Sequence, residues 1–278
     1  MNNSNQGDYW YRTIAKTYSL KQRQNWYSEA AAAYDRHRPR YPQSICDRAV
    51  ELTQLNSSST ILEIGCGPGI ATLEFAKRGY SLVSLEPSEA ACKLARRNCQ
   101  KYPKVRIINA TFEQWQPKTS KFDAVLAATS FHWLAPEIRY QKTAAVLKDQ
   151  GFLVLLWNTP PQPDVEVCRA MESAYQRHAP SLKISEQIAT YQENLHQIGE
   201  AVIKSGYFHQ LISDYLICEV TYSVDSYIGM LSTLSPYIML EAKQRNALFA
   251  DLKQVLHENY GSNLALSYCS MFQVAQKL

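Results

Sequence analysis

The sequence contains no apolar run of about 18 residues, the length that a transmembrane helix needs, so we expect no stable membrane insertion. The polar residues 1–8 also lack the apolar stretch of a signal peptide. Seven cysteines are present without a C-x-x-C pair, and an odd, scattered set is typical of reduced thiols rather than of disulfides or a zinc site. Together these absences predict a cytoplasmic protein.

An excess of charge of one sign is also missing. The net charge is +4 over 278 residues, which is too small to indicate a nucleic-acid partner. The histidines are dispersed and form no pattern such as H-E-x-x-H, so we expect no metal centre. Apolar residues make up 46% and charged residues 19% of the chain, which predicts one large globular domain, alone or with a smaller cap.

The sequence does contain a regular alternation of strand and helix patterns. Apolar runs predict strands at residues 60–64, 81–85, 105–109, 122–127 and 152–157. Two more strands are expected near residues 215–221 and 264–274. The residues before and between these two strands resemble helices, including a short one at 200–205 and a longer one from Ser235 to about Glu258. This rhythm predicts a doubly wound α/β sheet.

The most informative stretch is 61–69, where an apolar strand runs directly into a turn that contains Gly65, Gly67 and Gly69. Glycines allow a tight turn and a close approach of the backbone to a ligand. Glu86 ends the next apolar run, where a carboxylate can accept both hydroxyls of a ribose. We therefore expect a nucleoside-containing cofactor at the carboxyl ends of a parallel sheet.

Two details of this stretch separate the candidate cofactors. A dinucleotide fingerprint, G-x-G-x-x-G, would have its third glycine where this chain has Ile70, because Gly69 falls one place early. Glu63 precedes the loop, and a carboxylate there would repel a pyrophosphate but suit a cation. Both details disfavour a nicotinamide-dependent oxidoreductase.

The stretch from Leu62 to Gly69 resembles motif I of the class I S-adenosylmethionine-dependent methyltransferases, roughly [LV]-[DE]-[IVL]-G-x-G-x-G. The resemblance implies S-adenosylmethionine as the cofactor and a seven-stranded, mostly parallel sheet of order 3-2-1-4-5-7-6 with an antiparallel strand seven. It also implies that Glu63 holds the ammonium end of the cofactor, directly or through water, and that Glu86 holds the ribose. The other residues assigned to this part of the cofactor site are Gly65, Cys66, Gly67, Gly69 and Pro87.

A second element lies upstream, where residues 34–42 read Tyr-Asp-Arg-His-Arg-Pro-Arg-Tyr-Pro. It resembles the Y-x-x-x-R-P-x-Y-P element of the type-11 methyltransferase group, which includes the trans-aconitate methyltransferases. The resemblance implies that this segment closes over the cofactor, with Tyr34 beside the methyl group and Arg38 on the cofactor carboxylate. Arginine suits that task because its planar fork matches a carboxylate.

The ends of the third and fourth strands are expected to face the same crevice. Thr111 stands where many relatives have an acid, and it can hydrogen-bond the adenine while Phe112 packs on the ring. Ala127 and Ala128 leave room for the methionine chain of the cofactor.

The residues that follow the fourth strand, 130–133, have an S-x-H-W pattern that resembles the same group. His132 is a candidate general base, or a group that orients a substrate carboxylate. Trp133 can offer a π face to a cation or contact an apolar substrate. The alternative for both residues is that they only pack against the following helix.

These patterns divide the chain into four segments. Residues 1–40 are expected to form an N-terminal helical lid, and residues 41–158 the cofactor-binding core. Residues 159–200 are a helical insertion, and residues 201–278 complete the sheet with a helical cap between its last two strands. Insertions at the carboxyl ends of strands lie above the cofactor, so we expect them to cover the substrate.

The predicted activity is methyl transfer from S-adenosylmethionine to a small molecule with an acid, hydroxyl, activated carbon or lipid acceptor. The fold does not fix the acceptor. An RNA-modifying methyltransferase, a nicotinamide oxidoreductase and a catalytically silent cofactor-binding regulator are the alternatives.

Overall fold

The computed structural model describes residues 20–117 and 121–278 of the chain. Of the expected N-terminal lid, residues 1–19 lie outside the described residues. The remainder of that segment begins with a helix, α2 (Leu20–His37).

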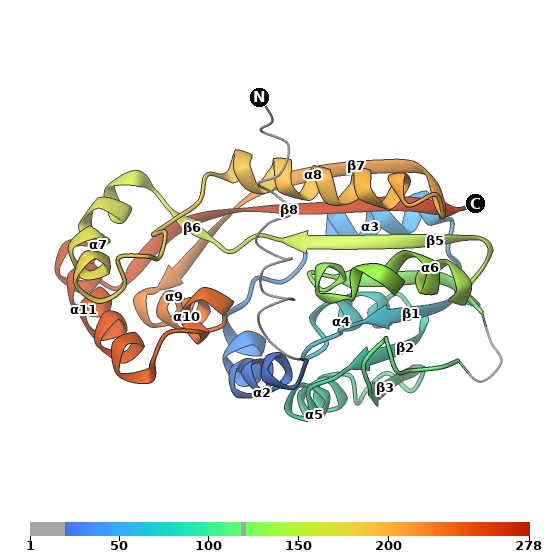
Figure 1. The fold of residues 1–278 in the computed structure, drawn as a ribbon, viewed down its shortest axis with the longest axis horizontal. Coiled ribbons are helices and arrows are strands. Elements are labelled where there is room, and N and C mark those ends of the chain that lie inside the picture. The colour runs from blue at the N-terminus through green and yellow to red at the C-terminus, as the bar shows by residue number, and fades with distance from the viewer. Residues whose placement is uncertain (1–19, 118–120) are drawn as a thin grey trace.

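A mostly parallel sheet forms the centre of the molecule (Figure 1). Its strands are β1 (Thr60–Ile64), β2 (Ser81–Glu86), β3 (Val105–Asn109), β4 (Phe122–Ala128), β5 (Leu147–Asn158), β6 (Gln162–Pro163), β7 (Phe208–Ser223) and β8 (Asn263–Lys277). The order across the sheet is β3-β2-β1-β4-β5-β8-β6, and β7 also pairs with β8. β8 is antiparallel to its neighbours, as expected for the last strand.

The short strand β6 is the one strand beyond the expected number. Gln162 pairs with Ser267 of β8, just past the pair between Asn158 and Ser270 that ends β5. β6 therefore continues the β5 side of β8 after a break, while β7 pairs along the opposite side. With this continuation set aside, the order is the expected 3-2-1-4-5-7-6.

Helices precede β1 and lie in the connections between strands, except β3–β4 and β5–β6, where the described residues contain none. Besides α2 they are α3 (Gln43–Thr53), α4 (Ile70–Lys77), α5 (Glu89–Asn98), α6 (Pro136–Val146), α7 (Val165–His178), α8 (Ile188–Lys204), α9 (Val224–Leu231), α10 (Ser235–Ile238) and α11 (Ala242–Tyr260). The side chains of Ser88, Asp164 and Ser223 cap α5, α7 and α9 by accepting a backbone N–H of the first turn.

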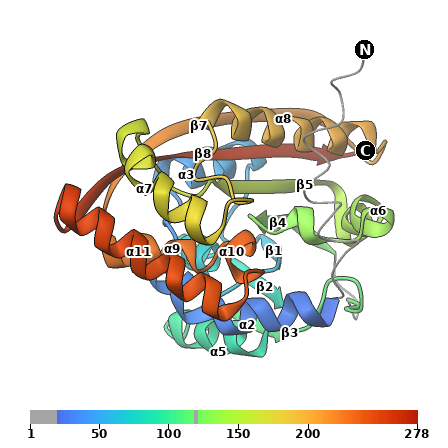
Figure 2. The same ribbon diagram turned by 60° about the vertical axis from the view of Figure 1, so that its left-hand side comes forward.

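Helices cover both faces of the sheet (Figures 1 and 2), and an apolar core lies on each face. α6 and α8 cover the face where Leu62 and Ile64 of β1 are buried. α3 and α4 cover the other face, where Ile61 is buried. Because alternate side chains of a strand point to opposite faces, Glu63 lies on the α4 side together with Ile61.

A helical lobe extends the molecule beyond one end of the sheet (Figure 1). α7, α9, α10 and α11 pack there around a third apolar core, which includes Met171, Tyr227 and Leu252. β8 contributes Leu264 and Leu266 to this core from its first residues, where it already pairs with β7. The expected insertion 159–200 is thus divided, because α7 belongs to the lobe whereas α8 packs on the sheet.

Two helices differ from the sequence-based expectation. α8 is one helix of 17 residues, where a short helix at 200–205 was predicted. Gly199 lies inside it because a Cβ at this position would stand 2.5 Å from Gln273 Nε2 of β8. The helix predicted from Ser235 to about Glu258 is instead divided into α10 and α11, and both parts contribute buried side chains to the third core.

Candidate active site

The glycine-rich loop joins β1 to α4, and each of its glycines has its own structural reason. All three have positive φ, 66° at Gly65, 55° at Gly67 and 90° at Gly69, which other residues rarely adopt. A Cβ at Gly65 would come within 2.8 Å of Ser130 Cβ, and one at Gly69 would stand 3.4 Å from Ala95 Cα of α5. A Cβ at Gly67 would meet nothing within 4 Å, so a ligand can approach the backbone at this residue.

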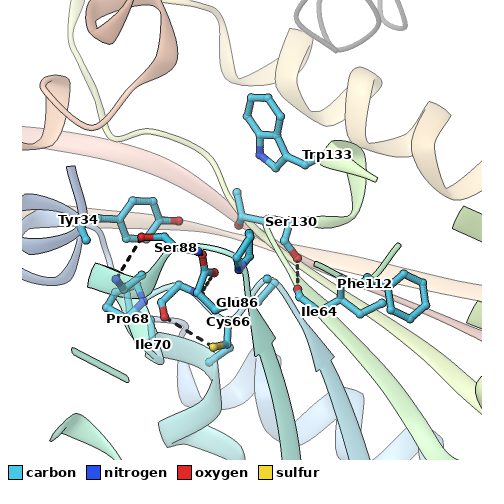
Figure 3. Close-up of a pocket in the computed structure, with 18 of the residues that line it drawn as sticks. Tyr34, Ile64, Cys66, Pro68, Ile70, Glu86, Ser88, Phe112, Ser130 and Trp133 are labelled. Carbon is cyan, nitrogen blue, oxygen red and sulfur yellow. Dashed lines mark hydrogen bonds between the residues drawn. The ribbon is translucent and has the colours of Figure 1, made fainter. Parts of the chain in front are cut away.

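A pocket opens beside this loop at the carboxyl ends of β1, β2 and β4 (Figure 3). It encloses about 1300 Å³, counting the part open to solvent. The expected site residues that line it are Tyr34, Arg38, Gly65, Cys66, Gly67, Glu86, Pro87, Thr111, Phe112, Ala128 and Trp133. Four expected residues do not line it, namely Glu63, Gly69, Ala127 and His132.

Of the two acids expected at the site, Glu86 is the one that lines the pocket. It is the last residue of β2, and its two carboxylate oxygens accept hydrogen bonds from the backbone amides of Gly67 and Ser88, both at 2.8 Å. Burial raises the pKa of Glu86, while these two hydrogen bonds lower it. A carboxylate oxygen accepts more than one donor, so each can still receive a hydroxyl group. Glu86 therefore fixes the loop and offers acceptors to the pocket.

Glu63 lies beneath the loop, on the α4 side of the sheet. Its Oε2 accepts hydrogen bonds from Thr72 Oγ1 at 2.6 Å and from Ser84 Oγ at 2.8 Å, and its Oε1 has no partner among the described residues. Burial raises the pKa of Glu63 to about 7, and the nearby charge of Glu86 acts in the same direction. The contact of Glu63 with a bound cofactor, direct or through water, stays a prediction.

The two residues expected beside an adenine ring, Thr111 and Phe112, make contacts within the protein as well as lining the pocket. Phe112 is buried, belongs to the core on the α6 side and exposes only part of its side chain to the pocket. Thr111 Oγ1 accepts the backbone N–H of Gln114 at 3.2 Å, which forms the turn after β3. Ala128 lines the pocket, but Ala127 points into the core, because successive residues of β4 face opposite sides.

Tyr34 and Arg38 bring the end of α2 to the pocket. The Arg38 guanidinium lies over the Tyr34 ring, 4.9 Å from its centre. Arg38 Nε donates to Thr233 Oγ1 at 2.8 Å, which links the segment after α2 to the residues before α10. Arg38 has no acidic partner among residues 20–117 and 121–278. It therefore provides the pocket with an arginine that no carboxylate of this part of the chain neutralises.

His132 and Trp133 lie in a single turn of 3₁₀ helix, Phe131–Trp133. The His132 ring packs against Trp133 and Trp157, with ring centres 4.9 Å and 5.6 Å away. Burial lowers the pKa of His132 to about 3, and the charge of Arg139 acts in the same direction. This geometry agrees with the packing alternative for His132, because the ring lies between two indole rings and does not line the pocket. Trp133 lines the pocket.

Sequence reasoning did not select six polar residues of the wall, namely Tyr41, Ser88, Glu113, Thr129, Ser130 and Asn158. Ser130 Oγ donates to Ile64 O and so joins the ends of β1 and β4. Thr129 has a φ of 53°, which is uncommon outside glycine. Tyr41 lies in the 34–42 motif and Ser130 in the S-x-H-W pattern, but neither pattern indicates the partners of these residues across the sheet.

Residues 20–117 and 121–278 contain neither a metal-binding cluster nor a membrane-spanning helix. No three His, Cys, Asp or Glu side chains there gather as a metal site would require. None of the helices in these ranges combines the length and apolarity of a membrane span.

Comparisons with known proteins agree with the motif. Residues 61–151 match a family model described as a methyltransferase domain. An uncharacterized methyltransferase of Mycobacterium tuberculosis is 29% identical over 133 residues, which is 48% of this chain and 52% of that protein. The probable S-adenosylmethionine-dependent methyltransferase CRG1 of Saccharomyces cerevisiae is 25% identical over 48% of this chain and 46% of that protein. The chain thus spans about half the length of these curated relatives.

Solved structures match over a larger share of the chain. A putative type II methyltransferase from Anaeromyxobacter dehalogenans aligns with a TM-score of 0.60 and 18% identity, covering 86% of this chain and 97% of that one. A phosphoethanolamine N-methyltransferase from Haemonchus contortus aligns with a TM-score of 0.51 and 12% identity, covering 90% of this chain and 57% of that one. At these identities the likeness concerns the fold.

Proposed function

We propose that the chain transfers a methyl group from S-adenosylmethionine to a small molecule, which the match of residues 61–151 to a methyltransferase domain supports. The observation that carries the proposal is the composition of one pocket wall. It contains Glu86, fixed by two backbone amides, and Arg38, which has no acidic partner among the described residues. These two groups match the ribose and the carboxylate of the cofactor.

The pocket residues would divide the cofactor among them. Glu86 would accept the ribose hydroxyls, and Thr111 and Phe112 would lie against the adenine. Arg38 would pair with the carboxylate, and Tyr34 would lie beside the methyl group. Glu63 would contribute negative charge from beneath the loop. A Cβ at Gly67 would meet no protein atom, so the bound nucleoside would take this space. A larger residue at position 67 would then collide with the nucleoside.

The chemistry requires positioning more than proton transfer. The sulfonium of the cofactor supplies an activated methyl group, and the chain must hold the acceptor in line with it and exclude water. The acceptor atom forms a bond to the methyl carbon while the bond from that carbon to sulfur breaks. Tyr34, Trp133 and Leu134 supply an aromatic and apolar wall that suits water exclusion.

The ionisable groups on this wall favour an acceptor that needs no base. Besides Arg38, the described lining residues that titrate are Glu86, Glu113, Cys66 and two tyrosines. The Glu86 carboxylate accepts two amides and is assigned to the ribose, Glu113 Oε1 accepts Ala135 N, and burial raises the pKa of Cys66 well above its usual value. A carboxylate acceptor is already ionised at neutral pH, so we propose a small organic acid as the substrate.

Calorimetry with S-adenosylmethionine, S-adenosylhomocysteine and NAD tests the cofactor. We expect heat with the first two and none with NAD. A methyl-transfer assay over organic acids, phenols, amines, lipids and tRNA then tests the acceptor. Transfer to an acid supports the proposal. Transfer only to tRNA would contradict the small-molecule acceptor, and binding of NAD alone would contradict the methyltransferase activity itself.

A further inference from the structure

Residues 38–42 connect α2 to α3 without regular secondary structure, although they carry Arg38 into the pocket wall. Two of these residues, Pro39 and Pro42, have no backbone N–H to donate. The helix bond from Arg38 N to Tyr34 O precedes this stretch, and the bond from Ile45 N to Pro42 O follows it. Side chains from elsewhere in the fold must therefore hold the segment in place.

Asn158, the last residue of β5, provides one such attachment. Its Nδ2 donates to Pro39 O at 3.1 Å and to Arg40 O at 3.2 Å. Both partners are carbonyl oxygens, so they fix the orientation of the Asn158 amide group, because only its nitrogen can donate to them. The side chain is 8% exposed and lines the pocket that Arg38 also lines.

Tyr41 and Thr129 provide a second attachment. Tyr41 is buried, and its hydroxyl is 2.8 Å from Thr129 Oγ1. Thr129 Oγ1 also accepts the backbone N–H of Asn158 at 3.3 Å, and Thr129 N donates to Leu156 O at 2.7 Å. The same hydroxyl therefore contacts the 38–42 segment and the end of β5, and Thr129 holds its left-handed backbone conformation between them.

We propose that Asn158 is a positioning residue which, with Tyr41 and Thr129, clamps residues 38–42 against the ends of β4 and β5 and so places Arg38 on the cofactor carboxylate. The inference rests on the proposed function, because it concerns how that cofactor is bound. Asn158 acts through Arg38 and is not assigned a contact with the reacting atoms.

Asn158→Asp tests the clamp, because it replaces the donating Nδ2 by an oxygen that faces the two carbonyl groups. We expect affinity for S-adenosylhomocysteine to fall about tenfold, the size expected when hydrogen bonds to a positioned segment are lost. Tyr41→Phe removes the other attachment with little change of shape, and a smaller loss in the same direction is expected. Asn259→Asp is the matched control, because Asn259 Nδ2 also donates to a carbonyl, that of Val255, on the exposed side of α11.

A double-mutant cycle separates positioning from general destabilisation. If Asn158 acts through Arg38, Asn158→Asp should cost less than about twofold in affinity when Arg38 is already alanine. An undiminished tenfold loss in the Arg38→Ala background would overturn the role, as would wild-type affinity in both Asn158→Asp and Tyr41→Phe. If Asn158→Asp fails to fold, Tyr41→Phe carries the same cycle. Absence of binding by the wild type would instead refute the proposed function.

Discussion

Two acids near the glycine loop, Glu63 and Glu86, are both buried but have different partners. Glu86 is stabilised as a carboxylate by two backbone amides, whereas Glu63 receives two side-chain hydroxyls and keeps one oxygen without a partner among the described residues. No cationic side chain pairs with either acid within residues 20–117 and 121–278. The positive charge that would balance them is therefore expected from the ligand.

Replacing Glu86 tests its contact with the ribose. Glu86→Gln keeps the size of the side chain but points an amide nitrogen at a backbone N–H, so one hydrogen bond to the loop is lost together with a ribose acceptor. We expect affinity for S-adenosylhomocysteine to fall by about 1.5–3 kcal/mol, the range for hydrogen bonds to a charged group. Titration calorimetry measures this. Glu89→Gln, at an exposed acid three residues further along, should bind like the wild type.

Replacing Glu63 tests its raised pKa through stability. Burial raises this pKa from 4.5 to about 7, so the folded state without ligand binds more protons than the unfolded state between these values. The stabilising contribution of Glu63 is therefore fully present below pH 4.5 and is lost as the pH rises through about 7. The loss amounts to about 3 kcal/mol, from 1.36 kcal/mol for each unit of pKa shift.

Glu63→Gln should remove this pH dependence. The difference in unfolding free energy between Glu63→Gln and the wild type should grow in favour of the mutant from pH 5 to pH 8, as measured by urea unfolding at each pH. Titrating groups that do not interact with Glu63 cancel in that difference, and the nearby Glu86 contributes a smaller change. A difference that stays constant across the range would show that Glu63 ionises at its ordinary pKa.

Among the elements, the central strands were predictable and the later ones were less so. β1 to β5 are apolar runs because helices cover both faces, and this signal is local in the sequence. The strand β6 contains only two residues, one of them a proline, so no pattern can reveal it. β7 begins earlier than the predicted 215–221, at Phe208, and residues 212–217 are exposed on both faces, which removes the alternation that marks a strand.

The same reasoning explains which parts of the site could be predicted. The glycine loop and Glu86 form a local pattern with a known spacing, and the structure brings them to one pocket. The attachment of Tyr41 to Thr129 and of Asn158 to Pro39 depends on how β4 and β5 meet the segment after α2, which no local pattern encodes. For His132, the position after a strand does not tell which way the ring turns, so its role as a base stays a prediction.

The N-cap of α5 gives a prediction at this scale. Ser88 Oγ accepts a hydrogen bond from the backbone N–H of Ala91. Ser88 also lines the pocket, and its own backbone N–H donates to the Glu86 carboxylate. Ser88→Ala should lower the free energy of unfolding by about 1 kcal/mol, the usual value of a serine cap, and should weaken S-adenosylhomocysteine binding. Ser223→Ala, which removes the equivalent cap of α9, should cost similar stability without affecting binding. Equal affinities of the two mutants for S-adenosylhomocysteine would show that the α5 cap does not contribute to binding.

At the scale of the molecule, α2 joins the sheet to the helical lobe. Arg38 contacts Thr233 of the lobe, and Tyr222 donates from the lobe end of β7 to His37 O at 2.6 Å. Gly229 of α9 lies against the His37 ring. Because α2 also carries Tyr34 into the pocket, the spacing between α2 and α9 affects the shape of the site.

Gly229→Ala should change that spacing. A Cβ at Gly229 would stand 2.5 Å from His37 Cδ2 and 2.6 Å from Nε2, so either the His37 ring turns away or the end of α2 moves away from α9. We expect weaker S-adenosylhomocysteine binding by about fivefold or more, corresponding to about 1 kcal/mol, together with a lower melting temperature. Gly199→Ala creates a similar collision, with Gln273 Nε2 at 2.5 Å, but between α8 and β8. It should lower the melting temperature while leaving affinity unchanged, and reduced affinity in both would indicate a global effect.

The position of β8 between β5 and β7 has a consequence for how the protein is made. Ribosomes synthesise β5 long before residues 263–277, yet the outer edge of β5 pairs with β8 along its last seven residues, from Phe152 to Asn158. Throughout that interval the nascent chain carries an apolar strand with an unpaired edge, the kind of segment that aggregates or recruits chaperones. Translation that stops before Asn263 should therefore yield an insoluble product rather than a smaller folded methyltransferase domain.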